Sequence, residues 1–137
     1  MREILFKAKR IDNGKWVEGY YLRKYDLLGN EEHVIFHTDS YKVWEYAEID
    51  SKTLCQFTGL CDKNGKRIWE NDILMAHLDE FYPEDVTCET VEWNVAGWVT
   101  HEANNVDRQY LDEFDTEHFE VVGNIFDNPE LLQEEHK

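Results

Sequence analysis

The sequence predicts a mainly β fold, a small barrel-like or sandwich fold of bent antiparallel strands with one or two short helices, including a C-terminal one. Two observations lead to this prediction. Aromatic residues make up 14% of the chain, a density that suits pleated, half-buried strand surfaces. Short apolar runs also recur at intervals of roughly 8–12 residues with turn residues between them, as in small sandwiches and barrels.

Hairpins are expected in the first part of the chain. Asn13 and Gly14 separate two apolar-rich runs, and both residue types tolerate the positive φ angles of a type I′ turn. A second turn is expected at residues 27–30. The strands expected around these turns occupy residues 4–10, 16–22, 33–37 and 41–49.

In the middle of the chain a turn is expected at residues 62–65, where Asp, Asn and Gly follow one another closely. Residues 79–89 are rich in acids around Pro83 and are expected to form a mobile surface loop. The strands expected on either side of the turn occupy residues 54–60 and 73–78, with Ile68 and Trp69 between them.

The last part of the chain predicts a hairpin, two short helices and a strand. Residues 95–97 separate the two strands of the hairpin, and a further strand is expected at residues 119–126. Asn128 and Pro129 suit the N-cap and first position of a C-terminal helix. The other helix is expected within residues 104–114, where apolar side chains recur every three or four residues: Val106, Tyr110, Leu111 and Phe114.

Length and charge limit the possible functions. A chain of 137 residues is long enough for one core and short for two ordinary domains, so we expect a single domain over residues 1–137. The chain has 14 basic and 30 acidic residues, a formal charge of −16. Because binding to nucleic acids or anionic membranes depends on Lys and Arg, we expect no direct nucleic-acid partner and no membrane association. A protein partner, or mimicry of nucleic acid by carboxylates, stays open.

The chain also lacks the features of an exported or membrane protein. No apolar stretch approaches the ~18 residues of a membrane span, and charges interrupt the apolar residues of the N-terminal segment. The cysteines, Cys55, Cys61 and Cys88, are odd in number and are expected to be reduced thiols of a cytoplasmic protein.

Three segments of the chain resemble the YopX-like family of phage and prophage proteins. They read REILFKAKRIDNGKWVEGYY, TGLCDKNGKRIWENDIL and FEVVGNIFDNPELL, in the order found in the family. Asn71 stands where the family usually has Gly, and Asn is the next-best residue for a left-handed backbone. The resemblance implies a mainly β, barrel-like fold, and it implies no established activity, substrate, cofactor or catalytic residue.

The middle segment concentrates the candidate site residues. Glu70 and Asp72 lie two positions apart, and paired carboxylates suit general acid–base or metal chemistry. Lys66 stands where a calcium loop needs a ligand. We therefore interpret the segment as structural, with carboxylates that accept backbone N–H groups in a turn and a cap. The residues of this motif are Thr58, Gly59, Asp62, Gly65, Glu70 and Asp72.

No metal, cofactor or catalytic residue is predicted. His33 and His37 would share a zinc ion on a helix, but the residues between them favour a strand, where four residues span about 13 Å. The cysteines lack zinc-knuckle spacing, Ser40 and Ser51 lack a nucleophile motif, and no glycine loop suits a phosphate. The tryptophans are expected in the core or at interfaces more often than against bases or sugars: Trp16, Trp44, Trp69, Trp93 and Trp98.

We interpret the chain as a phage or prophage accessory protein in the cytoplasm of the bacterial host. It is expected to be a non-enzymatic β module that binds another protein or a second copy through edge strands and exposed aromatics. One alternative is an acidic nucleic-acid mimic that blocks a host DNA-binding protein. Another is a hydrolase that uses Glu70, Asp72 and either His77 or His101. No motif identifies the partner, a small-molecule ligand or the stage of the phage life cycle.

Overall fold

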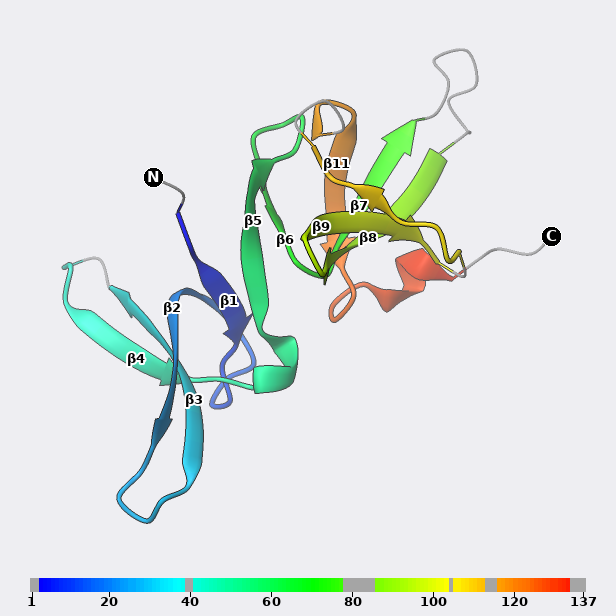
Figure 1. The fold of residues 1–137 in the computed structure, drawn as a ribbon. Coiled ribbons are helices and arrows are strands. Elements are labelled where there is room, and N and C mark those ends of the chain that lie inside the picture. The colour runs from blue at the N-terminus through cyan, green and yellow to red at the C-terminus, as the bar shows by residue number, and fades with distance from the viewer. Residues whose placement is uncertain (1–2, 39–40, 78–85, 104, 113–115, 134–137) are drawn as a thin grey trace. The chain divides into compact units, whose positions relative to one another are not determined.

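The computed structural model describes residues 3–38, 41–77, 86–103, 105–112 and 116–133 (Figure 1). The chain divides into two compact units, Met1–Phe57 and Thr58–Lys137. Each unit has its own cluster of buried hydrophobic residues. The single domain over residues 1–137 stays a prediction, because compact units can still unfold as one.

The first unit is an antiparallel sheet in which neighbouring strands follow the order β4-β3-β2-β1-β5. Strand β5 begins in this unit, where Cys55 and Gln56 pair with β1, and it ends in the second unit. The elements are β1 (Phe6–Lys9), β2 (Trp16–Tyr25), β3 (Glu31–Thr38), β4 (Trp44–Glu48), the 3₁₀ turn η1 (Ser51–Thr53) and β5 (Cys55–Cys61). Short loops join the first strands, as expected for antiparallel neighbours.

The hairpin of β1 and β2 is confirmed, but the type I′ turn is wrong. Gly14 has a φ angle of +71°, whereas Asn13 does not have a positive φ. Arg10 N donates to Lys15 O, so the loop is longer than a two-residue turn. Asn13 Oδ1 accepts the N–H of Lys15, and this side-chain bond fixes the loop in place of a second left-handed residue.

The sheet of the first unit has buried residues on both faces, with Ile35 and Ala47 on one face and Val34 on the other. Ile35 of β3 lies opposite Ala47 of β4, and both are nearly inaccessible to solvent. They pack with residues of β1, β2 and the segment after β4. Because side chains alternate across a pleated sheet, the neighbouring residues in β3 and β4 lie on the opposite face.

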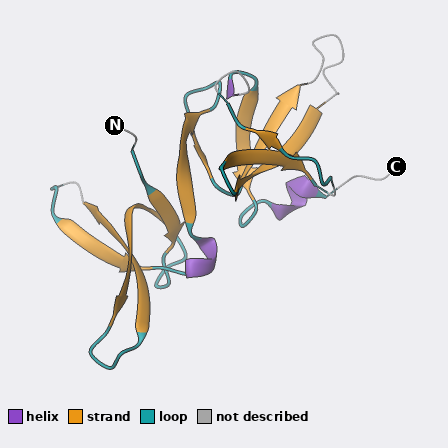
Figure 2. Ribbon diagram, viewed as in Figure 1, coloured by secondary structure: helices purple, strands orange, loops and turns teal. Residues whose placement is uncertain are grey.

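The second unit contains an antiparallel sheet with the order β10-β9-β8-β7-β11. Its elements are β6 (Arg67–Trp69), β7 (Asp72–His77), β8 (Val86–Asn94), β9 (Gly97–Glu102), β10 (Gln109–Tyr110), β11 (Phe119–Asn124) and the 3₁₀ turn η2 (Pro129–Leu132). Figure 2 shows strands throughout the described chain and only short helical turns. The prediction of a mainly β protein is confirmed.

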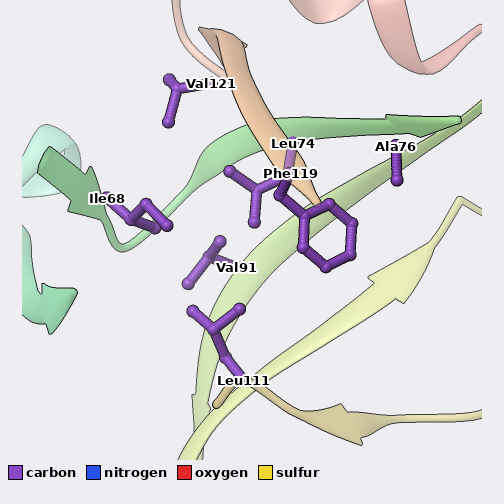
Figure 3. Packing of buried hydrophobic residues seen from close by; sticks show 7 residues of the cluster. All are labelled: Ile68, Leu74, Ala76, Val91, Leu111, Phe119 and Val121. Atoms are coloured by element: carbon purple, nitrogen blue, oxygen red, sulfur yellow. The ribbon is translucent and has the colours of Figure 1, made fainter. Parts of the chain in front are cut away.

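The core of the second unit gathers side chains from strands that are distant in sequence (Figure 3). Ile68 of β6 and Leu74 of β7 are fully buried, as is Val91 of β8. Phe119 and Val121 of β11 complete this cluster together with Ala76 and Leu111. Burial of these apolar side chains away from water is the main stabilising contribution to such a unit.

The predicted fold was barrel-like or a sandwich, and its barrel-like form is not confirmed, because the two sheets are not closed into a barrel among the described residues. Strand β6 follows β5 in the first sheet, which therefore ends at β4 and β6, and the second sheet ends at β10 and β11. Both sheets therefore keep edge strands, which closure would have removed.

The helix predicted within residues 104–114 is also wrong for the part that the structure describes. Tyr110 pairs with Val99 of β9, and Leu111 N donates to Trp98 O. The edge of the sheet supplies hydrogen-bond partners and a buried site for Leu111. These interactions stabilise the strand more than the local preference for a helix would stabilise a helix. Residues 104, 113 and 114 lie outside the described residues.

The acidic loop predicted at residues 79–89 is wrong for residues 86–89, which begin β8 and pair with β7. Residues 79–85 lie outside the described part of the chain. The C-terminal helix is a single 3₁₀ turn with Pro129 at its start, and the Asn128 side chain makes no cap bond there. Asn128 Oδ1 instead accepts the N–H of Asn124.

Candidate functional site

Thr58 and Gly59 of the middle motif lie in β5, at the start of the second unit. Thr58 is buried, and its Oγ1 donates to Ile68 O at 2.8 Å. The same oxygen accepts the N–H of Leu60 at 3.2 Å. Gly59 adopts a φ angle of +89°, a backbone conformation that is energetically costly for a residue with a side chain. These two residues shape the backbone and present no group for chemistry.

Asp62 is the centre of the turn that follows β5. Its Oδ1 accepts the N–H groups of Asn64 and Lys66, each at 2.9 Å. Its Oδ2 accepts the N–H of Val121 in β11, also at 2.9 Å. Gly65 N donates to the backbone oxygen of Asp62 and closes the turn. The side chain is only 6% exposed, so Asp62 holds β11 against the turn from within the unit.

Two opposing effects act on the pKa of Asp62. Burial raises the pKa, because the charged form loses hydration. The hydrogen bonds from Val121, Lys66 and Asn64 lower it, and together with the charge of Lys66 they outweigh burial, so the pKa lies below the usual value. Asp62 is therefore a charged structural group at neutral pH.

Glu70 and Asp72 flank a tight turn between β6 and β7. Asn71 between them has a φ angle of +69°, the left-handed conformation that its residue type tolerates. Asp72 is 2% exposed, and its Oδ2 accepts the N–H of Trp69 at 2.8 Å. Asn71 N donates to Val91 O and joins the turn to β8. A buried Asp72 carboxylate in this role is not presented to a substrate.

The histidines of the hydrolase alternative lie in the sheet of the second unit. His101 Nε2 is 3.0 Å from Thr90 Oγ1 and 3.5 Å from Glu92 Oε2, and its Nδ1 is 3.0 Å from Glu102 O. These contacts hold the ring within its own sheet. His77 belongs to β7, and its side chain lies outside the described part of the structure. Among the described residues, no hydrogen bond or ion pair joins His101 to Glu70 or Asp72.

His33 and His37 both lie in β3, on the strand that the sequence predicts. His33 Nδ1 is 2.5 Å from Tyr21 Oη, and its Nε2 is 3.2 Å from Glu31 Oε1. His37 Nε2 is buried without a hydrogen-bond partner among the described residues. The parts of the chain that the structure describes hold no group of three or more His, Cys, Asp and Glu that would bind a metal ion. The absence of a metal stays a prediction.

A cavity of about 520 Å³ opens in the first unit beside His33. The sequence motifs gave no indication of it, because its lining comes from three separate segments. Tyr21 and Glu31 fix the His33 ring at its wall. The charged residues of the lining have both signs: Lys9, Arg10, Glu31, Glu48 and Asp50. This mixed lining favours no single class of ligand.

The other face of the first unit's sheet carries exposed aromatic residues. Trp44 is 60% exposed, Tyr46 59% and Tyr20 53%. Tyr20 lies opposite Phe36, and Phe36 lies opposite Tyr46, so the rings cross β2, β3 and β4 on one face. The Tyr20 and Trp44 rings lie 6.0 Å apart, and those of Phe36 and Tyr46 lie 5.9 Å apart. We call this set, with the adjacent Leu22, the aromatic face.

The two units differ in charge as well as in exposed surface. Residues 1–57 contain nine basic and ten acidic residues, a net charge of −1. Residues 58–137 contain five basic and twenty acidic residues, a net charge of −15. Nearly all of the acidity thus belongs to the second unit, and the aromatic face lies in an almost neutral one.

The other tryptophans and the cysteines have mostly structural surroundings. Trp69 is buried, and Trp98 packs against the core of the second unit. Cys55 is buried, and Cys88 is half-buried, which raises the pKa of its thiol. Cys61 is exposed. No helix among the described residues is long and apolar enough to cross a membrane.

Comparisons with known proteins agree on the fold. A family model described as YopX protein matches residues 5–133. The crystal structure of protein EF1440 from Enterococcus faecalis is similar with a TM-score of 0.61 and 23% identity, covering 97% of this chain and 100% of that one. The structure of protein yopX from Bacillus subtilis is similar with a TM-score of 0.56 and 16% identity, covering 99% and 100%. No curated protein matches significantly.

Proposed function

Because this chain belongs to the YopX family and its first unit exposes an aromatic face, we propose that it is a non-enzymatic β module that works by binding protein. The aromatic face is the observation that carries the proposal. We place its action in the cytoplasm of a bacterial host, as a phage or prophage accessory protein. This setting rests on the resemblance of the three sequence segments.

Exposed aromatic residues gathered on one sheet face suit a protein partner. Tyr and Trp supply large contact areas with little loss of side-chain entropy, and they are enriched among the residues that dominate binding energy. Tyr20, Trp44 and Tyr46 are each more than half exposed. Residues 1–57 are also nearly neutral, so this unit repels an acidic partner less than a strongly acidic unit would.

Site-specific photo-cross-linking in bacteria tests the proposal. A photoreactive phenylalanine analogue at Tyr46 should give covalent adducts with a defined protein, identified by mass spectrometry. The same analogue at Val95, an exposed turn residue of the second unit, is the control and should give none of these adducts. Absence of adducts at Tyr46, Trp44 and Tyr20 alike would contradict a protein-binding role for this face.

A nucleic-acid mimic is the second candidate, favoured by the charge of −15 on residues 58–137. Carboxylates in two rows at roughly phosphate spacing would support it. Asp62 and Asp72 do not count toward such rows, because both are buried and accept backbone N–H groups. The test is competition: the purified protein should displace duplex DNA from a host DNA-binding protein, and no displacement at high excess would contradict mimicry.

A hydrolase receives little support from the environment of its acids. Asp72 is 2% exposed and is bonded to the backbone of Trp69. His101 is held by Thr90 and Glu102 in its own sheet. The absence of enzymatic activity is accordingly part of our proposal.

A further inference from the structure

Strand β4 is the outer strand of the first unit's sheet. Ile49 N donates to His33 O, so the backbone groups of Ile49 point toward β3. The direction of the backbone N–H and C=O groups alternates along a strand. The backbone groups of Ala47 and Glu45 therefore also point toward β3, whereas those of Trp44, Tyr46 and Glu48 point away from the sheet.

One of the outward positions is already paired, and two are not. Glu48 O accepts the N–H of Ile11. Among the described residues, the outward N–H and C=O groups of Trp44 and Tyr46 have no hydrogen-bond partner. An edge of this kind is a template for another strand, and its free length is limited to these two outward residues.

We propose that this edge of β4 pairs antiparallel with β4 of a second copy of the chain, with Trp44 of each copy opposite Tyr46 of the other. The proposal rests on the proposed function, since it names the partner of the aromatic face. In this register each Trp44–Tyr46 pair exchanges two hydrogen bonds, so all the free outward groups of both residues are satisfied. The register excludes Glu48, whose outward oxygen is already occupied.

The same register makes the aromatic face continuous across the two copies. Trp44 and Tyr46 lie on one face of the sheet together with Tyr20 and Phe36. Directly opposed residues on neighbouring strands approach within about 5.5 Å, and aromatic cross-strand pairs stabilise sheets. Two rings from each copy would therefore meet at the junction, where solvent now reaches more than half of each ring.

The first unit is the part of the chain whose net charge opposes a second copy least. Copies of a chain with a formal charge of −16 repel one another, and residues 58–137 carry −15 of that charge. Glu45 of each copy would face Glu45 of the other on the opposite side of the sheet. Arg10 lies near Glu45 and is attracted to it, but its guanidinium also forms an ion pair with Asp12 at 2.9 Å, so it offsets only part of this repulsion.

The contact is small, and we expect a weak dimer. Stable complexes bury about 1,600 Å² in total, and two rings with two outward backbone positions from each copy fall well short of this area. A dissociation constant on the order of 100 µM is expected. Analytical ultracentrifugation of the full chain at concentrations up to about 1 mM should show a monomer–dimer equilibrium.

Substitutions in β4 test the register. Tyr46→Pro removes an N–H that points out of the sheet and no bond within it, so it should weaken dimerisation at least about tenfold. Trp44→Lys keeps every backbone group and places a charge at the edge, and it should weaken the dimer to a similar degree if the proline variant fails to fold. Val95→Lys adds the same charge at an exposed turn of the second unit and should leave the dimer unchanged.

The outcomes separate this inference from the proposed function. A protein that stays monomeric up to about 1 mM overturns the β4 pairing, and so does a dimer that Tyr46→Pro and Trp44→Lys do not weaken. Photo-cross-links from Tyr46 to a different protein, with a monomer in the centrifuge, overturn the second copy as the partner and leave the proposed function standing. Cross-links between two chains of this protein support both.

Discussion

The Asp62 carboxylate joins segments that lie 59 residues apart in the sequence, because one oxygen serves the local turn and the other accepts the N–H of Val121. The local part of this arrangement follows from the sequence, since Asp followed by Asn and Gly is a turn signal. The bond to Val121 does not, because no local pattern specifies which distant strand will lie beside the turn. The sequence therefore predicts the role of Asp62 in the turn, but it does not predict the bond to Val121.

Replacing Asp62 by Asn should lower the free energy of unfolding by about 2–3 kcal/mol. The amide has the shape of the carboxylate, but it loses the charge that strengthens three hydrogen bonds from backbone N–H groups, and its NH₂ group faces donors. Urea unfolding measures the change. Asp26→Asn is the matched control, because Asp26 also caps a turn but is only partly buried, and its loss should be much smaller.

The stabilising effect of Asp62 should also depend on pH. Its pKa in the folded protein lies below the usual value, which is about 3.9 in an unfolded chain. The carboxylate therefore stabilises the fold fully above that unfolded pKa, and this contribution is lost as the pH falls through the lower, folded value. The stability difference between the wild type and Asp62→Asn should stay constant from pH 7 to about 5 and shrink below about 4. A difference that grows on acidification would contradict this sign.

At the scale of elements, the strand pairing of β2 with β3 depends on Gly19. A Cβ atom at this position would lie 2.0 Å from Phe36 O and 2.9 Å from Ile35 Cγ2. The sequence predicts both strands, but it gives no sign that their backbones approach so closely at this residue. Close approach is a property of the paired strands and is absent from either strand alone.

We predict that Gly19→Ala lowers the free energy of unfolding by about 3 kcal/mol or more, since backbone atoms of β3 must move. Gly14→Ala is the comparison. It has a φ angle of +71° but open space around its Cα, so only the backbone conformation is penalised, at about 1 kcal/mol. Thermal or urea unfolding of both variants gives the comparison, and equal losses would argue against the contact with Phe36 O.

Residues 109–111 show why an element was predicted wrongly. The apolar spacing around Tyr110 and Leu111 suits a helix, and the structure has a two-residue strand there instead. Leu111 gains a buried site and a hydrogen bond to Trp98 O. A short stretch has little intrinsic preference, so the available edge of β9 decides its conformation. Elements with strong turn signals, such as the hairpin of β8 and β9, were predicted correctly.

At the scale of the whole molecule, the prediction of a single domain requires the two units to unfold cooperatively. Strand β5 belongs to both units: Cys55 and Gln56 pair with β1, and Thr58 bonds to Ile68. A strand shared in this way should transmit unfolding from one unit to the other. The division of charge between the units could not be inferred from the total of −16, because the boundary at Phe57 lies inside a continuous strand.

We predict that the two units unfold together. Cys55 and Cys88 are native probes, one in each unit, and both are at least partly protected. With the exposed Cys61 replaced by Ser, labelling of the two thiols across a urea series should give the same midpoint, because β5 couples the units. Two separated midpoints would show independent domains and would contradict the single-domain prediction.

The contiguity of the first unit has a consequence for synthesis on the ribosome. All of the pairings among β1, β2, β3 and β4, and the pairing of β1 with β5, lie within residues 1–57. At roughly 5–20 residues per second, the remaining 80 residues take several seconds to emerge. The nascent chain can therefore present a finished β4 edge before most of its negative charge has emerged from the ribosome. Neighbouring ribosomes on one messenger would hold such edges close together, which would let copies meet during translation.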